Sequence, residues 1–111
     1  MPFISQSEIE SRAEKTLFPG VVTRTWWREQ MLISRVTLEP GAEAFLHSHS
    51  NEQAGVVLSG TLIMKVGDEE RTLLPGELYI APGDVPHRAV AGPEGCVVVE
   101  FFSPLREPLM Y

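Results

Sequence analysis

The sequence contains a single cysteine, Cys96, so the chain cannot form a disulfide within itself. Because this residue adjoins the apolar run Val97–Val99, we interpret it as a buried, unreactive thiol. No apolar run approaches the roughly 18 residues that a membrane-spanning helix needs. Residues 1–6 also lack the basic and apolar regions of a signal peptide. We therefore expect a cytoplasmic protein that has no membrane partner and folds without crosslinks.

Positive charge is also scarce. The chain of 111 residues has a formal net charge of −6, and it contains no run of basic residues interleaved with aromatic ones. This composition argues against a nucleic-acid partner. Hydrophobic residues make up 43% of the chain, which is enough for one core at a length typical of one domain. We predict a single domain over residues 1–111.

Helical patterns are rare as well. The nine glycines and nine prolines fall at fairly even intervals and separate short runs rich in apolar and β-branched residues. Several short strands at this spacing are typical of an all-β sandwich or barrel. The predicted strands are residues 31–38, 53–58, 61–66, 78–81 and 96–102. The one predicted helix spans residues 7–17, with a capping box formed by Ser7 and Glu10.

Histidine is limited to three residues, and their spacing is the most informative feature of the chain. His47 and His49 are two residues apart, so on a strand both project from one face, with Phe45 beside them. A bend after them can return Gln53 to the same space, and a rigid proline-containing segment leads to His87. Three imidazoles and one amide oxygen suit a divalent transition metal and leave coordination positions open. The predicted ligands are His47, His49, Gln53 and His87, with Zn, Ni, Mn or Fe as the ion.

Two alternatives remain open at this point. Glu52 could bind the ion in place of Gln53, but strand alternation turns it to the opposite face. Alternatively, the histidines could be polar residues at the mouth of a barrel that holds no metal.

Residues 41–60 and 76–87 closely resemble the two sequence motifs of the cupin superfamily. The glycines, histidines, glutamine and proline that carry the likeness are Gly41, His47, His49, Gln53, Gly60, Gly76, Pro82 and His87. The resemblance implies a single cupin barrel of the jelly-roll type (a double-stranded β-helix) with a short N-terminal segment. Three positions depart from the usual pattern: Gln53 replaces a glutamate, Asp84 replaces a glycine with Gly83 one place early, and Ala91 replaces an asparagine.

The replacement of glutamate by Gln53 has a chemical consequence. A glutamine contributes only a carbonyl dipole, so a bound metal keeps more positive charge and is the stronger Lewis acid. The same change makes a high oxidation state less stable. The substitution therefore favours polarisation of a carbonyl or enol over activation of oxygen.

A second polar group lies in the last predicted strand, where Glu100 and Phe102 share one face. A glutamate in so apolar a strand is costly to bury unless it is paired or functional. On an interior face Glu100 can act as a general acid or base, Phe102 can stack on a planar ligand, and Arg106 can bind a carboxylate. In the structural alternative, Glu100 pairs with Arg35 or Arg88.

The predicted ligands together with residues 100–106 are similar to the small single-cupin family that includes pectin-degradation uronate cyclases. Members of that family convert unsaturated uronates from cyclic to linear keto forms. The resemblance implies that Glu100 is the acid or base and that Phe102 and Arg106 contact substrate. That family uses an aspartate where this chain has the longer Glu100. The ligand set also resembles that of metal-dependent polyketide cyclases, so the ligands alone do not identify the substrate.

These features predict a metal-dependent isomerase or cyclase that acts on a small carbonyl or enol compound, such as an unsaturated uronate. A dioxygenase built on the same site and a non-catalytic binder of a small ligand are the alternatives. We also predict a homodimer formed through apolar outer faces that include Val56, Leu58, Trp26 and Trp27. In the alternative arrangement, both tryptophans close one end of the barrel.

Overall fold

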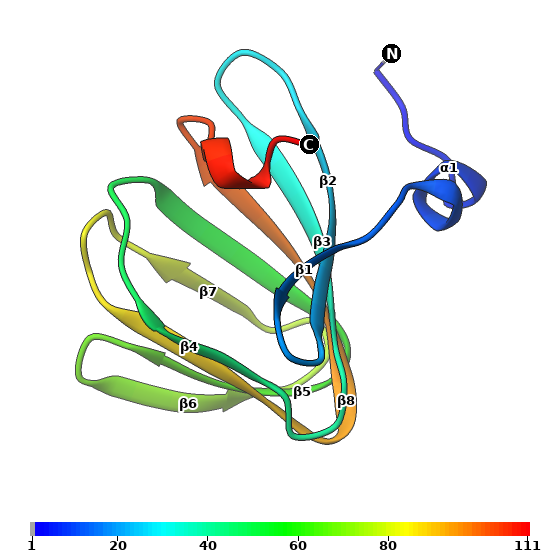
Figure 1. Cartoon of the computed structure of the whole chain (residues 1–111). Coiled ribbons are helices and arrows are strands. Elements are labelled where there is room, and N and C mark those ends of the chain that lie inside the picture. The colour runs from blue at the N-terminus through cyan, green and yellow to red at the C-terminus, as the bar shows by residue number, and fades with distance from the viewer. Residues whose placement is uncertain (1) are drawn as a thin grey trace.

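The computed structural model describes residues 2–111, and most of the chain forms antiparallel strands (Figure 1). A short helix, α1 (Gln6–Ser11), comes first, and a 3-10 turn, η1 (Glu107–Leu109), comes last. The strands between them are β1 (Lys15–Phe18), β2 (Val21–Trp27), β3 (Leu32–Leu38), β4 (Glu43–His47), β5 (Glu52–Val66), β6 (Glu69–Leu73), β7 (Leu78–Ala81) and β8 (His87–Ser103). The prediction of an all-β fold is confirmed.

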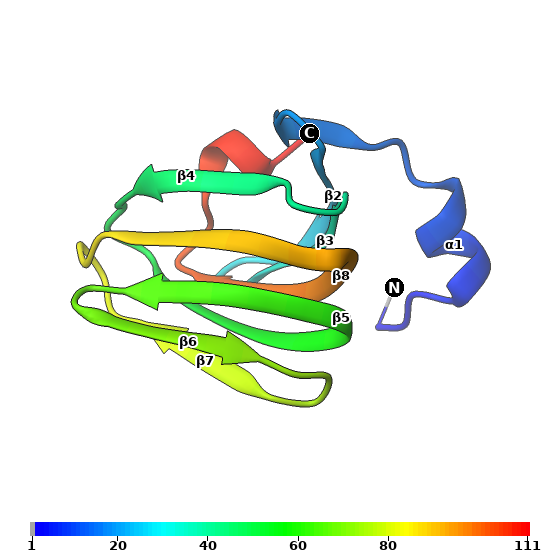
Figure 2. The same ribbon diagram turned by 90° about the horizontal axis from the view of Figure 1, so that it is seen from below.

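Two long strands, β5 and β8, bend and take part in both layers of the barrel. The first half of β5 pairs with the second half of β8, and this layer continues through β7 on one side and through β3, β2 and β1 on the other. The second half of β5 pairs with the first half of β8, flanked by β6 and β4. Figure 2 shows β4, β8, β5 and β6 side by side across the face nearer the viewer.

The turn signal at Ser59-Gly60 marks this bend in β5 and not the end of a strand. The register with β8 shifts here, and the residues that face the core change from the odd-numbered Val57 to the even-numbered Leu62. Gly60 has a φ of +71°, and a Cβ at this position would lie 2.0 Å from the carbonyl oxygen of Gly95. Only glycine fits such a close approach in this conformation. Because pairing with β8 continues on both sides of the bend, residues 52–66 form one strand in place of the two that we predicted.

The core lies between the two layers. Its buried side chains come from the inward-facing positions of β2, β3, β5 and β8: Val21, Val36, Leu38, Val57, Leu62, Met64, Ala91, Cys96 and Val98, together with Leu73. Cys96 is buried as predicted, and burial raises the pKa of its thiol to about 11. A second cluster of Leu32, Phe102 and Leu109 lies apart from this core.

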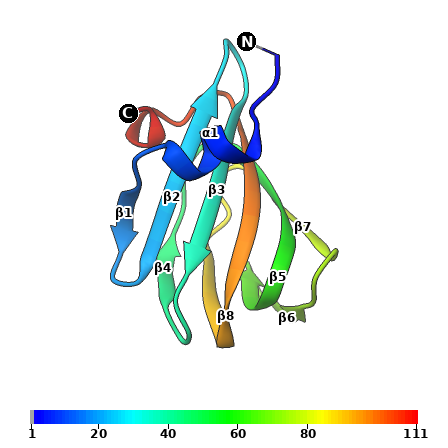
Figure 3. The same cartoon turned by 90° about the vertical axis from the view of Figure 1, so that its right-hand side faces the viewer.

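Helix α1 is shorter and begins earlier than we predicted. Ser5 is its N-cap and forms the capping box with Glu8, in place of the predicted pair Ser7 and Glu10. From Lys15 onward the chain pairs with β2, so the ladder of the sheet replaces the continued helix. The helix buries none of its residues and lies across the outer side of β2 and β3 (Figure 3). Within residues 2–111, no helix combines the length and apolar character needed to span a membrane.

The outer face of the first layer carries one apolar row, next to a row that includes Arg24 and Arg35. Strand register places Trp26, Ile33, Phe101, Ala54 and Ile80 in one row across β2, β3, β8, β5 and β7. Ile80 is 69% exposed, which is unusual for so large an apolar side chain. Trp27, in contrast, packs against the second cluster. Only one of the two tryptophans therefore belongs to this outer row.

This face supports the predicted homodimer, which stays a prediction. We expect sedimentation equilibrium at micromolar concentration to give the mass of two chains, because pairing would remove the apolar row from water. An Ile80→Asp variant should then have the mass of one chain. Leu74→Asp is the control, because Leu74 is also exposed but follows β6 in the other layer. A one-chain mass for the unaltered protein would contradict the prediction.

Candidate metal centre

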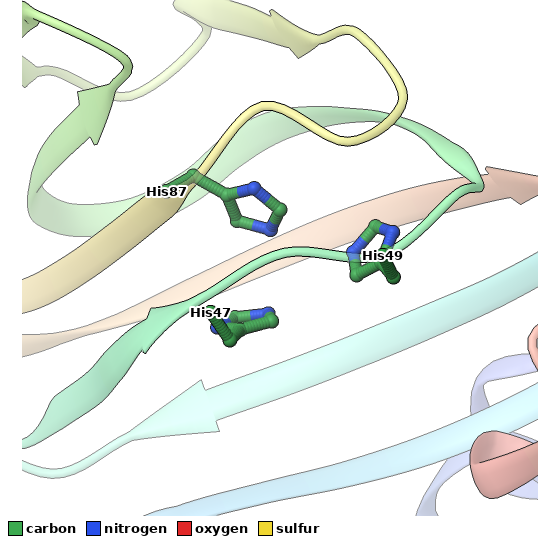
Figure 4. Close-up of side chains that lie close together, drawn as sticks. All are labelled: His47, His49 and His87. Atoms are coloured by element: carbon green, nitrogen blue, oxygen red, sulfur yellow. The ribbon is translucent and has the colours of Figure 1, made fainter.

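The three histidines meet at one end of the barrel, although they come from separate segments. His47 ends β4, His49 follows it, and His87 begins β8 directly opposite His47 in the register of the two strands. One nitrogen of each ring lies within 4.8 Å of a nitrogen from each of the other two (Figure 4). The structure therefore brings together all three histidines that the sequence singled out.

Backbone carbonyls determine which nitrogen of each ring faces the cluster. Nδ1 of His47 lies 2.7 Å from the carbonyl oxygen of Phe45, and Nδ1 of His87 lies 2.9 Å from that of Val85. Nδ1 of His49 lies 3.1 Å from the carbonyl oxygen of Asn51. Because a carbonyl only accepts hydrogen bonds, neutral His47 and His87 carry the proton on Nδ1 and have a free lone pair on Nε2, and neutral His49 has the same form when its Nδ1 donates to Asn51. This is the tautomer that binds a metal through Nε2.

His87 gives the clearest sign that a ligand is expected. Its side chain is 2% exposed, and its Nε2 is the one buried side-chain nitrogen or oxygen without a hydrogen-bond partner among the described residues. A buried polar atom without a partner is destabilising and therefore uncommon. A cation held between the three rings would satisfy this lone pair.

Gln53 directs its oxygen to the same place. It lies on β5 and is 4% exposed, with Oε1 at 2.9 Å from Nε2 of His49. Its Nε2 points the other way and donates to the hydroxyl of Tyr79 at 2.6 Å and to Oε2 of Glu100 at 2.9 Å. Glu52, the alternative ligand, is exposed on the opposite face of the strand. With the His49 proton on Nδ1, its Nε2 and the Oε1 of Gln53 are two acceptors 2.9 Å apart, which a cation bound by both would stabilise.

The four donor groups fit a divalent transition metal. Three neutral imidazoles and one amide oxygen are ligands of intermediate softness, which suit Zn, Ni, Mn or Fe, and the cluster retains space for further ligands. Burial lowers the pKa values of His49 and His87, which favours the neutral rings that can bind an ion. The charge of Arg106 lowers both pKa values further.

The turn before His87 explains one departure from the cupin pattern. Gly83 passes so close to the first motif that a Cβ there would lie 2.5 Å from the carbonyl oxygen of Ser50. Asp84 has a φ of +66°, a left-handed conformation that aspartate tolerates better than most residues. Its backbone N–H donates to the carbonyl oxygen of His49 at 2.7 Å. This turn thus holds the segments of His49 and His87 together.

Glu100 faces the interior of the barrel, next to the histidine cluster. Its Oε2 accepts hydrogen bonds from Tyr79 and from Gln53. Burial raises the pKa of its carboxyl group, and these two hydrogen bonds oppose the shift. Neither predicted structural partner is next to it: Arg88 pairs with Glu43 at 3.0 Å, and Arg35 lies opposite Val99 on the other face of the strand pair.

A cavity of about 250 Å³ adjoins these groups. Its walls include His47, Gln53, His87, Glu100 and Arg106. This volume is slightly below the roughly 300–1,000 Å³ that is usual for ligand pockets, so it suits a small molecule. The cavity therefore places three of the four predicted ligands, one acid and one guanidinium around a common space, and His49 is not among the residues that line it.

Phe102 occupies a different place from the one that we predicted. It is 1% exposed, belongs to the second cluster and does not line the cavity, so it offers no open face for stacking on a substrate. Its ring instead lies against His49 with centroids 5.7 Å apart. The guanidinium carbon of Arg106 lies 5.3 Å from its ring centroid. Phe102 therefore packs against two residues of the site, His49 and Arg106, and does not face the cavity.

Sequence reasoning missed Tyr79 on β7. Its hydroxyl accepts from Gln53 and donates to Glu100, and burial with the nearby charge of Glu100 raises its pKa well above the ordinary value. The available signal was Gly55, a glycine in the interior of a strand, which often marks the close approach of another group.

Residues 34–102 match the cupin domain family. The chain belongs to the cupin family. The matched segment contains every strand from β4 to β7 and most of β3 and β8, with all four predicted ligands. The resemblance noted from the two motifs is thereby confirmed.

Two curated relatives carry names that state a role. The pectin degradation protein KdgF of Dickeya dadantii is 30% identical over 81 residues, which cover 72% of this chain and 74% of that protein. The H2HPP isomerase of Bacillus subtilis is 43% identical over 61 residues, which cover 54% of this chain. The matched segment spans only 25% of the isomerase's own length.

Solved structures agree that the chain has the cupin fold. KdgF from a Halomonas species has a TM-score of 0.89 and 26% sequence identity, and the match covers 99% of both chains. An RmlC-like cupin from Shewanella frigidimarina has a TM-score of 0.88 at 23% identity, over 99% of this chain and 97% of the other. The second likeness concerns the fold alone.

Proposed function

We propose that this cupin is a metal-dependent isomerase or cyclase that acts on a small carbonyl or enol compound, with unsaturated uronates as the first substrates to test. The likeness to two KdgF proteins, one of them over nearly the whole fold, supports the uronate class. The likeness to the H2HPP isomerase supports isomerisation as the type of reaction.

The convergence of donor groups at one point carries the proposal. Three imidazole lone pairs and Oε1 of Gln53 face one another, and Nε2 of His87 has no other partner. The ion that we assign to this place would act as a Lewis acid on the oxygens of a carbonyl or enol substrate. Gln53 adds no negative charge, which favours this chemistry over oxygen activation.

Glu100 is the group that we assign to proton transfer. It reaches the cavity from β8, and its Oε2 is held by Tyr79 and Gln53 while Oε1 takes no part in either bond. Burial raises the pKa of its carboxyl group, against the opposing hydrogen bonds of Tyr79 and Gln53, and a raised pKa favours a carboxyl group that accepts and returns a proton. Glu100 can therefore remove a proton from a substrate carbon or hydroxyl and deliver it to another atom.

Arg106 is the group that we assign to binding a carboxylate. Its guanidinium lies over the ring of Phe102 and lines the same cavity as Glu100. A guanidinium binds a carboxylate through two parallel hydrogen bonds, which fixes the orientation of a planar acid. Phe102 keeps Arg106 in place, and this supporting role replaces the stacking role that we predicted for it.

The proposal is tested on the unaltered protein by elemental analysis and by a panel of unsaturated uronates. We expect about one equivalent of a divalent transition metal per chain, and loss of the ultraviolet absorbance of the unsaturated bond without oxygen. Chelation should abolish turnover, and re-addition of the metal should restore it. Oxygen uptake during turnover would assign a dioxygenase instead. Tight ligand binding without turnover of any member would assign a non-catalytic binder.

A further inference from the structure

An interior row of the sheet links Tyr79 to Glu100. Strand register places Tyr79 of β7 opposite Gly55 of β5, and Gly55 opposite Glu100 of β8. Three positions on neighbouring strands thus lie in line, and the middle one has no side chain. Tyr79 can therefore reach across β5 and bond to a residue two strands away.

Gly55 provides the space that this contact needs. A Cβ at residue 55 would lie 2.3 Å from Cε1 and 2.8 Å from Cζ of Tyr79. Atoms do not approach so closely, so the ring occupies the volume that any other side chain would fill. The φ of Gly55 is not positive, so the backbone conformation does not require glycine here. The close approach of the Tyr79 ring explains why this position has no side chain.

The direction of the hydrogen bonds determines the orientation of the Gln53 amide. The Tyr79 hydroxyl has one proton and donates it to Glu100, so it can only accept from Gln53. The nitrogen end of the amide must then face Tyr79 and Glu100, and the oxygen end must face His49. A flipped amide would place its oxygen against the Glu100 carboxylate and lose both hydrogen bonds.

We propose that Tyr79 is a positioning residue that holds the Gln53 carbonyl oxygen toward the three histidines and binds one oxygen of Glu100. Its ring occupies the space that the absent side chain of Gly55 leaves. This inference rests on the proposed function, because it assigns a task toward the same metal centre. It extends that function by connecting the metal ligands to the proton-transfer group through one hydroxyl. A flipped amide would present N–H groups to a cation, which cannot bind it.

The test is the binding of Co²⁺, measured by competition with a chelator and by the visible absorption spectrum of the ion. For Tyr79→Phe we expect the dissociation constant to rise about 10-fold, at the low end of the contribution of groups that orient metal ligands. The spectrum should also change, because the oxygen ligand is no longer held. Tyr111→Phe is the matched control, since its hydroxyl bonds to the backbone carbonyls of Ala13 and Thr23. It should leave both readouts unchanged.

A Gly55→Ala variant tests the contact between Tyr79 and Gly55 by filling the space that the ring occupies. Its methyl group should displace the Tyr79 ring and raise the dissociation constant by a similar factor. In the double variant with Tyr79→Phe, the two effects should not add, because each removes the same hydroxyl from Gln53. Two independent losses of packing would instead multiply the two increases in the dissociation constant. That result would overturn the inference.

The outcomes separate this inference from the proposed function. Unaltered protein that binds Co²⁺, with the same affinity and spectrum in Tyr79→Phe, would overturn the positioning role and leave the metal centre intact. Unaltered protein that binds no Co²⁺ would overturn the metal centre and the positioning role together.

Discussion

A His87→Ala variant is expected to lose nearly all of the stabilisation that added metal gives the protein. His87 is the most buried of the three histidines, and its Nε2 has no partner within the described chain. Removal of a ligand should weaken binding by more than the 10–100-fold typical of groups that only orient ligands. Metal at about 100 times the dissociation constant stabilises the folded state by about 2.7 kcal/mol, and a 100-fold weaker site reduces this to about 0.4 kcal/mol.

The measurement is urea unfolding with and without the metal. The metal-free curves report how much stability the substitution itself removes, and the difference between the two curves reports binding alone. Glu100→Gln is the matched control, because its amide oxygen can replace Oε2 as the acceptor for Tyr79 and Gln53. The control should keep the full metal effect. An undiminished metal effect in His87→Ala would contradict the ligand assignment.

A Glu100→Gln variant is expected to keep the metal and lose turnover. An amide cannot accept and return a proton near neutral pH, so kcat should fall about 100- to 10,000-fold, the usual contribution of a general acid or base. The measurement is the rate of loss of the unsaturated bond at saturating uronate, with metal content determined on the same sample. A KM close to that of the unaltered protein would show that substrate still binds.

Glu100→Asp is the matched variant for this prediction. It keeps the carboxyl group but shortens the side chain by one methylene, which moves the proton-transfer group by more than about 1 Å relative to the hydrogen bonds of Tyr79 and Gln53. We expect activity between those of the unaltered protein and Glu100→Gln. Full activity in Glu100→Gln would remove the proton-transfer role from this residue.

The fold and the histidine cluster could be predicted because their signals are local. The spacing of His47 and His49 predicted two rings on one side of the chain, and the structure brings the rings together although β4 ends at His47. Gly and Pro at even intervals mark the bends of an all-β chain, and the match over residues 34–102 agrees with that interpretation. The boundaries of β7 agree with the prediction because Pro75-Gly76 and Pro82-Gly83 enclose it.

Other features depended on which strands become neighbours. Alternation shows that Glu100 and Phe102 share a face, but burial within that face differs along the barrel, so one lines the cavity and the other lies in a core cluster. The predicted helix over residues 7–17 was wrong in its second half, because Lys15–Phe18 gains a strand partner in β2 that no local pattern indicates. The turn at Ser59-Gly60 became a bend for the same reason.

By itself, the sequence determined the class of fold, the residues able to bind a metal and the face that each strand residue shares with its neighbours. These follow from backbone geometry with a period of two and from the chemistry of the side chains. Only the tertiary structure decided that Tyr79 reaches Glu100 across Gly55 and that the Gln53 oxygen faces His49. The reason is that these contacts join strands far apart in the chain, and their register is set by the packing of the whole barrel.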